Sequence, residues 1–474
     1  MVQPILLNDE QMRRFIVDGY LVLKPNLPAE LHKRVYDRLD RVIRKEGNPG
    51  NNILPAVPEL QALLDSPEVC GAMQSVLGRG YMLHPHRFTH NNEPRAMTDS
   101  EGQAGAGSAL FVGWHQDSHS PLGRPRHHRC RYAMLLYYPQ DTPPEMGPTQ
   151  LIPDTQYSHS LTEEARARGH IVPGEAGSCV LIHFDIGHGG SLNVSDKTRY
   201  MVKWVFTRIE EPAEPTWNFN DGAPFWPEDI SDLVWRKPEI YEASEEHALI
   251  WDSHWNWLTG GPSSNSELGA ADKKILYDSH PRSQWNEDAI VMETSAFDAI
   301  EQGENAINDL LEELASEDEW RRINAIFALG EMGREALPTI PILRKILNEN
   351  SHPIVRTALD AIGQICCGSN ESFSEIYELL KKSDPEWEKP LRRGWCGRDQ
   401  VRVNAVTALL RIGDRSNEAE AVVIEALNDS CGYVGGFGVE YLLRLGTPNA
   451  LKASIAYLQA HRWDDSLMRG VRTF

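Results

Sequence analysis

The sequence predicts a multidomain α+β protein, in which a jelly-roll β domain is followed by an all-α repeat domain. In the first half, short apolar runs alternate with turns rich in glycine and proline, which is typical of a sandwich or barrel of the jelly-roll kind. From about residue 296 the apolar residues recur with the period of a helix, and a short motif repeats along the chain. A length of 474 residues is enough for two or three domains, each with its own core.

The N-terminal residues predict a helix, a strand and a second helix, in that order. Asn8 can cap the first helix, Gln11 would complete a capping box, and the helix should end at Asp18-Gly19. Residues 20–23 then read as a short apolar strand. The second helix is amphipathic, and its apolar face consists of Leu31, Val35, Leu39 and Val42.

Three longer apolar runs predict buried strands, at residues 132–138, 179–184 and 200–206. Each run has the length of a strand and few polar residues, as expected where both faces of a sheet are covered. Turns rich in glycine and proline separate them, so the strands belong to one compact β domain.

The composition excludes several classes of protein. A formal net charge of −21 argues against general nucleic-acid binding, which calls for a basic surface. No run of apolar residues is long enough to span a membrane, and the first residues lack the basic and apolar regions of a signal peptide. The seven cysteines are scattered without a CxxC pair, which indicates reduced thiols. We therefore expect a cytoplasmic protein with no membrane or nucleic-acid partner.

The central motif of the first half is Gly113-Trp114-His115-Gln116-Asp117. Residues i and i+2 of a strand point to the same face, so a strand here would aim the His115 imidazole and the Asp117 carboxylate at one point. One more histidine would complete the 2-His-1-carboxylate triad that holds non-haem Fe(II) with open positions. His119 would share the same face and is an alternative to His115.

His188 is the candidate third ligand. It follows the buried strand that ends at Phe184, and the small residues after it leave room for a metal and its exogenous ligands. Arg199 begins the next strand, where its guanidinium could hold a carboxylate in a bidentate pair. Taken singly, His188 could be a hydrogen-bonded loop histidine and Arg199 a surface charge, but the order and spacing of the motif and these two residues favour a metal centre.

The first half of the chain resembles the phytanoyl-CoA dioxygenase family of Fe(II)/2-oxoglutarate oxygenases, over roughly residues 7–210. The resemblance is carried by Leu7-Asn8-Asp9-Glu10-Gln11 with Phe15 and Asp18-Gly19-Tyr20, by His115-Gln116-Asp117, by the segment Met146–Pro153, and by His188 and Arg199. The sequence departs from the family pattern at several positions. Met146 stands where the family commonly has asparagine, and Pro153-Asp154-Thr155-Gln156 replaces its Pro-Gly-Ser-His.

The resemblance implies a double-stranded β-helix (jelly-roll, cupin-like) domain that uses Fe(II), 2-oxoglutarate and O2. The implied iron ligands are His115, Asp117 and His188. Arg199 would bind the far carboxylate of 2-oxoglutarate, and Thr149 or Gln150 would assist. Halogenating relatives carry a small residue in place of the aspartate, so the presence of Asp117 favours hydroxylation of a C–H bond, with release of succinate and CO2.

Two further stretches each allow two interpretations. Residues 124–129 form a basic cluster, which is either a solvated loop or a rim that holds an anionic group of the substrate. Tryptophan and phenylalanine are concentrated in residues 217–281. These aromatic residues either bury irregular chain against the β domain or line the substrate entrance.

A six-residue motif recurs in the C-terminal part. Residues 325–330, Ala-Ile-Phe-Ala-Leu-Gly, return as residues 358–363 and 405–410 and more loosely as 438–443, at offsets of 33, 47 and 33 residues. An insertion therefore lies within residues 366–400. Small residues let helices approach closely, and each unit must stack on its neighbours to bury its apolar face. The units resemble short HEAT-like repeats, which could bind a protein partner, dimerise or stabilise the chain.

We therefore expect an oxygenase domain at residues 1–260 with a tryptophan-rich extension from about 211, a linker at 261–296, and HEAT-like repeats at 297–474. The predicted substrate is a small organic or carrier-bound molecule, since fold and cofactor do not select it further. Two alternatives stay open. One is a non-enzymatic scaffold that works through the repeats, and the other is a cupin-type metal enzyme that does not use 2-oxoglutarate.

Overall fold

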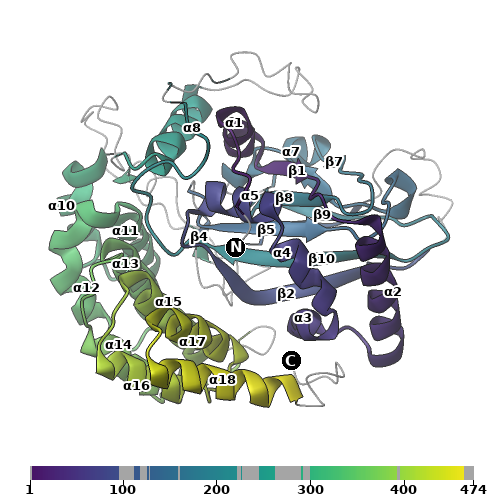
Figure 1. Ribbon diagram of the computed structural model, residues 1–474. Helices are drawn as coiled ribbons and strands as arrows, with labels where there is room; N and C mark the ends of the chain where they lie inside the picture. Colours follow the sequence, from purple (N-terminus) through teal and green to yellow (C-terminus); the bar gives the residue numbers. More distant parts are fainter. Residues whose placement is uncertain are drawn as a thin grey trace.

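The computed structural model shows a β domain with a helical repeat domain curving around it (Figure 1). It describes residues 3–95, 111–117, 125–126, 129–157, 161–220, 222, 226, 245–261, 290–291, 299–300, 302–391 and 396–463. The predicted class, a jelly-roll domain followed by helical repeats, is confirmed.

The β domain consists of two sheets that face each other. The larger sheet has the order β1-β8-β5-β10-β2 and the smaller one β3-β9-β6-β7. The strands are β1 (Tyr20–Leu23), β2 (Met82–Asn92), β3 (Phe111–His115), β5 (Tyr132–Tyr137), β6 (Gln150–Ile152), β7 (His170–Ile171), β8 (Cys179–His183), β9 (Gly187–Ser191) and β10 (Arg199–Thr207). A separate parallel pair joins β4 (Pro125–Arg126) to β11 (Ile290–Val291).

Helices cover the outer face of the larger sheet (Figure 1). The helices of this domain are α1 (Asp9–Asp18), α2 (Ala29–Glu46), α3 (Ile53–Ala56), α4 (Gln61–Leu64), α5 (Pro67–Leu77), α7 (Glu163–Ala167) and α8 (Glu245–Leu258). The predicted capping box of α1 is confirmed. The Gln11 N–H donates to Asn8 Oδ1 at 2.9 Å, and the Asn8 N–H donates to Gln11 Oε1 at 3.0 Å.

Strand β10 shows how the alternation of side chains divides the core. Trp204 and Phe206 lie in the hydrophobic cluster on the helix side of the sheet, whereas Met201 and Val205 lie in the cluster between the two sheets. By the same alternation, Arg199 and Lys203 share the inward face with Met201. Strand β10 therefore brings two cationic side chains into the space between the sheets.

The tryptophan-rich segment is more regular than predicted, because α8 (Glu245–Leu258) lies within a stretch that we expected to be irregular. Its described tryptophans favour the burial interpretation. Trp217, Trp251 and Trp255 belong to the cluster on the helix side of the larger sheet, away from the space between the sheets. Of the predicted linker at 261–296, residues 262–289 and 292–296 lie outside the described residues, as does Trp235.

The repeat domain is built of paired helices, and the recurring motif lies in the second helix of each pair. The pairs are α10 (Ile307–Glu313) with α11 (Glu319–Glu331), α12 (Ile340–Ile346) with α13 (His352–Ile365), α14 (Ser374–Lys381) with α15 (Gly397–Ile412), and α16 (Asn417–Ala426) with α17 (Gly432–Leu445), followed by α18 (Pro448–Trp463). The predicted insertion lies between α14 and α15, where Trp387 is buried.

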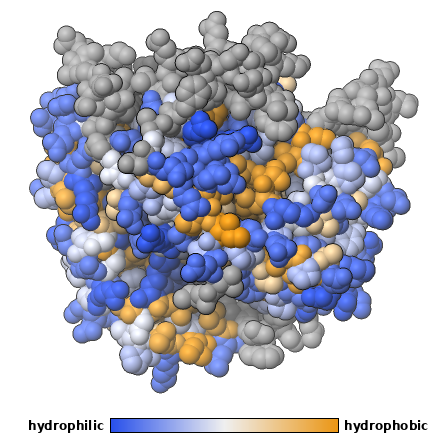
Figure 2. Space-filling model, turned by 45° about the horizontal axis from the view of Figure 1, so that its top comes forward, coloured by the Kyte–Doolittle hydropathy of each residue, from blue (hydrophilic) through white to orange (hydrophobic). Residues whose placement is uncertain are grey.

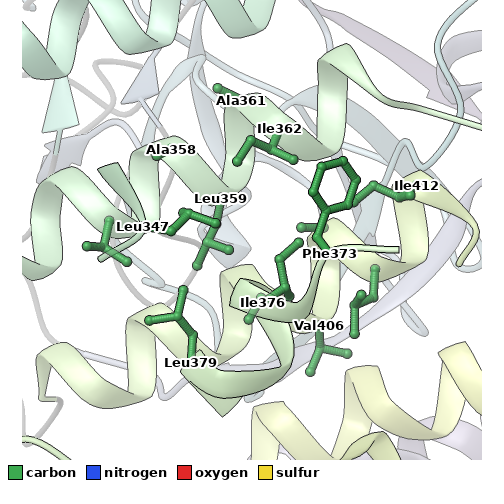
Figure 3. Close-up of a cluster of buried hydrophobic side chains, with 14 of the residues drawn as sticks. Leu347, Ala358, Leu359, Ala361, Ile362, Phe373, Ile376, Leu379, Val406 and Ile412 are labelled. Carbon is green, nitrogen blue, oxygen red and sulfur yellow. The ribbon is translucent and has the colours of Figure 1, made fainter. Parts of the chain in front are cut away.

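Close approach of the second helices is the physical reason for the small residues in the motif. A Cβ added to Gly330 of α11 would lie 2.9 Å from Ala361 Cα in α13, and one added to Gly363 would lie 3.0 Å from Ala408 Cα in α15. Larger apolar residues of neighbouring units, such as Phe373 and Ile376, then fill the space between the pairs (Figure 3). One continuous cluster of buried residues runs through the stacked units.

The inner helices of the repeat domain pack directly on the β domain. The hydroxyl of Tyr433 in α17 lies 2.7 Å from Nδ1 of His86. The same hydroxyl accepts a hydrogen bond from the Asn51 amide at 3.1 Å. The Phe437 ring stands edge-on to the His84 ring at 4.8 Å between centroids. Strand β2, which continues to His90 between the sheets, is therefore held at its other end by the repeats.

A buried ion-pair network forms the second part of this interface. Nε of Arg131 lies 2.7 Å from Glu331 Oε1 of α11, and both side chains are almost fully buried, at 2% and 3% exposure. Arg131 also pairs with Glu211, and Arg129 donates to the backbone carbonyl of Glu331. Burial lowers the pKa of Arg131, but the two carboxylates outweigh it and raise the pKa above its ordinary value.

This network corrects one interpretation of the basic cluster. Arg129, which we placed in either a solvated loop or a substrate rim, is buried between the domains together with the adjacent Arg131. The side chains of residues 124–128 lie outside the described part. The described arginines therefore lend no support to an anionic substrate.

One face of the molecule is mainly hydrophilic around a strip of hydrophobic residues (Figure 2). Within the described ranges, no helix has the length and apolar character needed to cross a membrane.

His84 lies where strand β2 packs on the repeat domain, and it makes this interface between the domains sensitive to acid. Burial, followed by the charges of His86 and Arg87, lowers its pKa well below 6.5. The pKa of His84 is lower in the folded chain than in the unfolded chain, so the unfolded chain takes up the proton first. The folded chain is therefore favoured above pH 6.5, and this contribution is lost as the pH falls below that value. We expect the free energy of unfolding to fall less between pH 6.5 and 5 in His84→Gln than in wild type, by up to about 1.4 kcal/mol per pH unit. Denaturant titrations at both pH values measure the difference, and equal pH slopes would contradict it.

Candidate metal and cosubstrate centre

His115 and His188 lie directly opposite each other on the antiparallel strands β3 and β9. Opposed residues of an antiparallel pair have neighbouring side chains, and here the ring centroids are 4.2 Å apart. The pairing is irregular between Val112 and His115, and Gly113 in that interval has a φ of +70°. A bulge at this point re-aims the residue that follows it, which is how such irregularities are used beside active sites.

Asp117 reaches the same point from beyond the end of the strand. We expected one strand to carry both His115 and Asp117, but β3 ends at His115. The Gln116 side chain holds the chain that follows, because its amide donates to the backbone carbonyls of Thr155 at 2.8 Å and Asp185 at 3.0 Å. With Gln116 anchored on one side, Asp117 turns inward and is 6% exposed.

The three side chains form a compact set of metal ligands. Asp117 Oδ1 lies 3.6 Å from His115 Nε2, and Asp117 Oδ2 lies 3.7 Å from His188 Nε2. One donor atom from each residue lies within 4.8 Å of the other two. This is the only group of three or more such donors among the described residues. Two imidazoles and one carboxylate are the donor set that non-haem Fe(II) centres use.

Backbone contacts at Nδ1 leave Nε2 of His115 and of His188 available to bind a metal. Nδ1 of His115 lies 2.8 Å from the Gly113 carbonyl, and Nδ1 of His188 lies 3.0 Å from the Ile186 carbonyl. A proton on Nδ1 makes Nε2 the lone-pair donor, and such contacts orient metal-binding imidazoles. Burial and then the neighbouring His115 lower the pKa of His188 to about 3, so a metal need not displace a proton from it at neutral pH.

One side of this centre is open. The His115 side chain is 52% exposed, whereas those of Asp117 and His188 are nearly buried. A metal held by the three ligands could therefore be reached by further ligands from the side of His115.

Arg199 lies deeper between the sheets and has the properties of a carboxylate receptor. Its Nε donates to the Gly147 carbonyl at 3.1 Å, and Nη1 donates to the His90 carbonyl at 3.4 Å. Burial lowers its pKa, and the only other group that shifts it is Tyr138. No carboxylate of the described residues forms an ion pair with Arg199, so this buried charge lacks the counter-charge that buried ions require. A bound carboxylate would supply it.

Thr149 and Gln150 flank the same region from β6 and the residue before it. Thr149 Oγ1 accepts a hydrogen bond from the Tyr138 hydroxyl at 2.6 Å, and Gln150 donates to the Gly190 carbonyl at 2.9 Å. Their predicted role beside 2-oxoglutarate stays a prediction. Tyr138, which the sequence reasoning did not single out, joins Thr149 to the surroundings of Arg199.

Lys203 is a residue of this site that the sequence did not single out. Its Nζ lies 3.1 Å from Asp117 Oδ2, and its side chain is 11% exposed. The signal was present, because a lysine four residues after Arg199 in a buried strand must share its inward face.

Among the described residues, no other histidine of the first domain belongs to the group of metal donors. His84 and His86 lie at the interface with the repeats. The alternative ligand His119 lies outside the described residues, as do the side chains of His127 and His128.

Comparison with known families agrees with this geometry. Residues 15–201 match the family model described as phytanoyl-CoA dioxygenase (PhyH), and residues 307–389 match that of HEAT repeats. Both predicted resemblances are therefore confirmed over these ranges. No curated protein matches the chain in sequence.

Solved structures similar to this chain include three enzymes. The alpha-ketoglutarate-dependent epimerase SnoN from nogalamycin biosynthesis is 16% identical, with a TM-score of 0.32 over 42% of this chain and 83% of SnoN. The carbocyclase SnoK of the same biosynthesis is 20% identical, with a TM-score of 0.34 over 44% and 88%. EctD from S. alaskensis, solved with 2-oxoglutarate and 5-hydroxyectoine, is 16% identical, with a TM-score of 0.35 over 44% and 79%.

Proposed function

We propose that this chain, in which a phytanoyl-CoA dioxygenase domain is joined to HEAT repeats, is an active Fe(II)- and 2-oxoglutarate-dependent oxygenase. The observation that carries the proposal is the meeting of His115, Asp117 and His188 at one point, with both Nε2 atoms turned toward the carboxylate. The donor set fits Fe(II), and the buried guanidinium of Arg199 fits the far carboxylate of 2-oxoglutarate.

The side chains of the centre have separate tasks. His115, Asp117 and His188 hold the metal on one face and leave its other positions free. Arg199 orients the cosubstrate, with Thr149 and Gln150 beside it. When bound, iron and 2-oxoglutarate activate O2 to oxidise a substrate, while 2-oxoglutarate is converted to succinate and CO2. The open side next to His115 gives a small or carrier-bound substrate access to the metal.

The finer part of the proposal is that the oxidation is a hydroxylation of a C–H bond. Asp117 supports it, because a carboxylate ligand occupies the position that a halide would need. The two alternatives are less well supported. A scaffold without activity gives no physical reason for a buried Arg199 and a converging triad, and an enzyme that does not use 2-oxoglutarate gives no occupant for Arg199.

The repeats, in this proposal, brace the catalytic domain. Their inner helices contact β2 and the residue just before β5, as the contacts of Tyr433 and Glu331 illustrate. These contacts occupy part of the surface that solenoid repeats commonly offer to other molecules. A protein partner of the repeats would therefore bind where these contacts leave their surface uncovered, as on the outer helices.

Anaerobic titration of the apoprotein with Fe(II) and then 2-oxoglutarate tests the function. A weak visible metal-to-ligand charge-transfer band is expected when the cosubstrate chelates the metal. If iron binds but the band does not appear, the result favours the alternative of a cupin-type metal enzyme that does not use 2-oxoglutarate. If no metal binds, the enzyme assignment is wrong and the scaffold alternative leads.

Arg199→Met separates the cosubstrate site from the metal site. Loss of a buried, charge-assisted pair is expected to raise the dissociation constant of 2-oxoglutarate by about 30-fold or more. Metal affinity measured without 2-oxoglutarate should change by less than about threefold, because Arg199 contacts none of the three ligands. Unaltered 2-oxoglutarate affinity in a folded Arg199→Met protein would contradict the assigned role.

A further inference from the structure

Lys203 is a buried cation whose counter-charge is a metal ligand. Its ammonium lies 3.1 Å from Asp117 Oδ2, and both side chains are largely shielded from water. Asp117 is the only carboxylate that pairs with it among the described residues. A buried ion pair needs each partner, because removing one leaves an uncompensated charge in a poorly solvated place.

The surroundings of Lys203 contain further positive or neutral groups. On its own strand face, Arg199 lies four residues earlier, and the paired strand β2 places Phe88 opposite Lys203 and His90 opposite Met201. The Asp117 carboxylate lies 3.6 Å through Oδ1 from Nε2 of His115 and 3.7 Å through Oδ2 from Nε2 of His188. The ammonium of Lys203 and a divalent metal held between the histidines would therefore compete for the Asp117 carboxylate.

We propose that Lys203 is the built-in counter-cation of the metal centre and competes with the metal for Asp117. Without metal, it neutralises Asp117. With metal bound, it stays as the outer hydrogen-bond donor to the same carboxylate and withdraws charge from it. This inference rests on the proposed metal centre and adds a residue that sets its affinity and electronic character.

The charge of Lys203 should weaken metal binding while it stabilises the metal-free protein. A fixed positive charge near the centre opposes a divalent ion, and this repulsion is large in a poorly solvated site. Removing the charge takes away the ion pair between Lys203 and Asp117. The metal-free protein should then be less stable, and metal binding should be tighter.

Lys203→Met and Lys203→Arg form the deciding pair, with Lys24→Met as a control lysine that pairs with Glu175 outside the centre. Each protein is titrated with Co(II) alone, so that the result does not depend on 2-oxoglutarate. Lys203→Met should bind Co(II) about tenfold more tightly than wild type and show a larger rise of melting temperature on metal addition. Lys203→Arg and Lys24→Met should stay within about twofold of wild type.

A spectroscopic readout follows the withdrawal of charge. In the anaerobic Fe(II)–2-oxoglutarate complex, loss of the lysine charge makes Asp117 a stronger donor, so the charge-transfer band of Lys203→Met should move to longer wavelength. The band of Lys203→Arg should keep the wild-type position. If Lys203→Met does not fold, Lys203→Gln, which keeps a donor of similar reach without the charge, takes its place with the same expected directions.

The outcomes separate this inference from the proposed function. Wild-type protein that binds neither Co(II) nor Fe(II) overturns both. Wild-type binding together with unchanged or weaker Co(II) binding in the charge-free variant overturns the role of Lys203 alone. Tighter binding in Lys203→Arg as well would show that the charge is not the cause, and would also overturn it.

Discussion

His188→Ala is expected to weaken metal binding by more than about 100-fold and to abolish the charge-transfer band of the Fe(II)–2-oxoglutarate complex. Even loss of a group that only orients a ligand costs about 10- to 100-fold in metal affinity, and His188 is itself a ligand in the proposed centre. The two remaining donors, His115 and Asp117, cannot hold the metal on one face. Anaerobic titration with Fe(II), followed by visible spectroscopy with 2-oxoglutarate, measures both effects.

His170→Ala is the matched control for this variant. His170 also lies in the smaller sheet, on β7, but its Nε2 is 3.1 Å from the Tyr20 hydroxyl and it contacts none of the three ligands. The control should keep the wild-type metal affinity and the band. A folded His188→Ala protein that retains both would show that the metal, if bound, is held elsewhere.

Glu331→Ala is expected to lower the free energy of unfolding by about 3 kcal/mol, the largest stability effect that we predict for a single substitution. Its carboxylate is 3% exposed and pairs with Arg131, which is 2% exposed. Breaking a buried pair typically costs about 3–5 kcal/mol, and the remaining pair with Glu211 places this case at the lower end. Denaturant unfolding followed by circular dichroism measures the change.

Glu349→Ala controls for loss of a carboxylate within the same repeat domain. Glu349 pairs with Arg322, but its side chain is 34% exposed, so the pair is partly screened by water. The expected cost is about 1 kcal/mol or less. Equal costs for the two variants would contradict the view that the pair between Glu331 and Arg131 joins the domains.

The residues of the centre could be predicted because their chemistry leaves marks in the sequence. A His-x-Asp motif, a histidine after a buried strand and an arginine at the start of the next strand have the order of a recognised family. The reason first given for His115 and Asp117, a shared strand face, was wrong in detail, because β3 ends before Asp117. The two side chains meet through Gln116, whose anchoring contacts lie far away in the sequence.

The sequence by itself determined the jelly-roll strands and the helical repeats and predicted the triad and Arg199, since these depend on local periodicity and on residue types in a fixed order. Only the tertiary structure decided that Lys203 pairs with Asp117, that the repeats fold back onto β2, and that Arg129 and Arg131 lie buried between the domains. These features join residues distant in the chain. Their partners are selected by burial and charge balance in three dimensions, which no local pattern records.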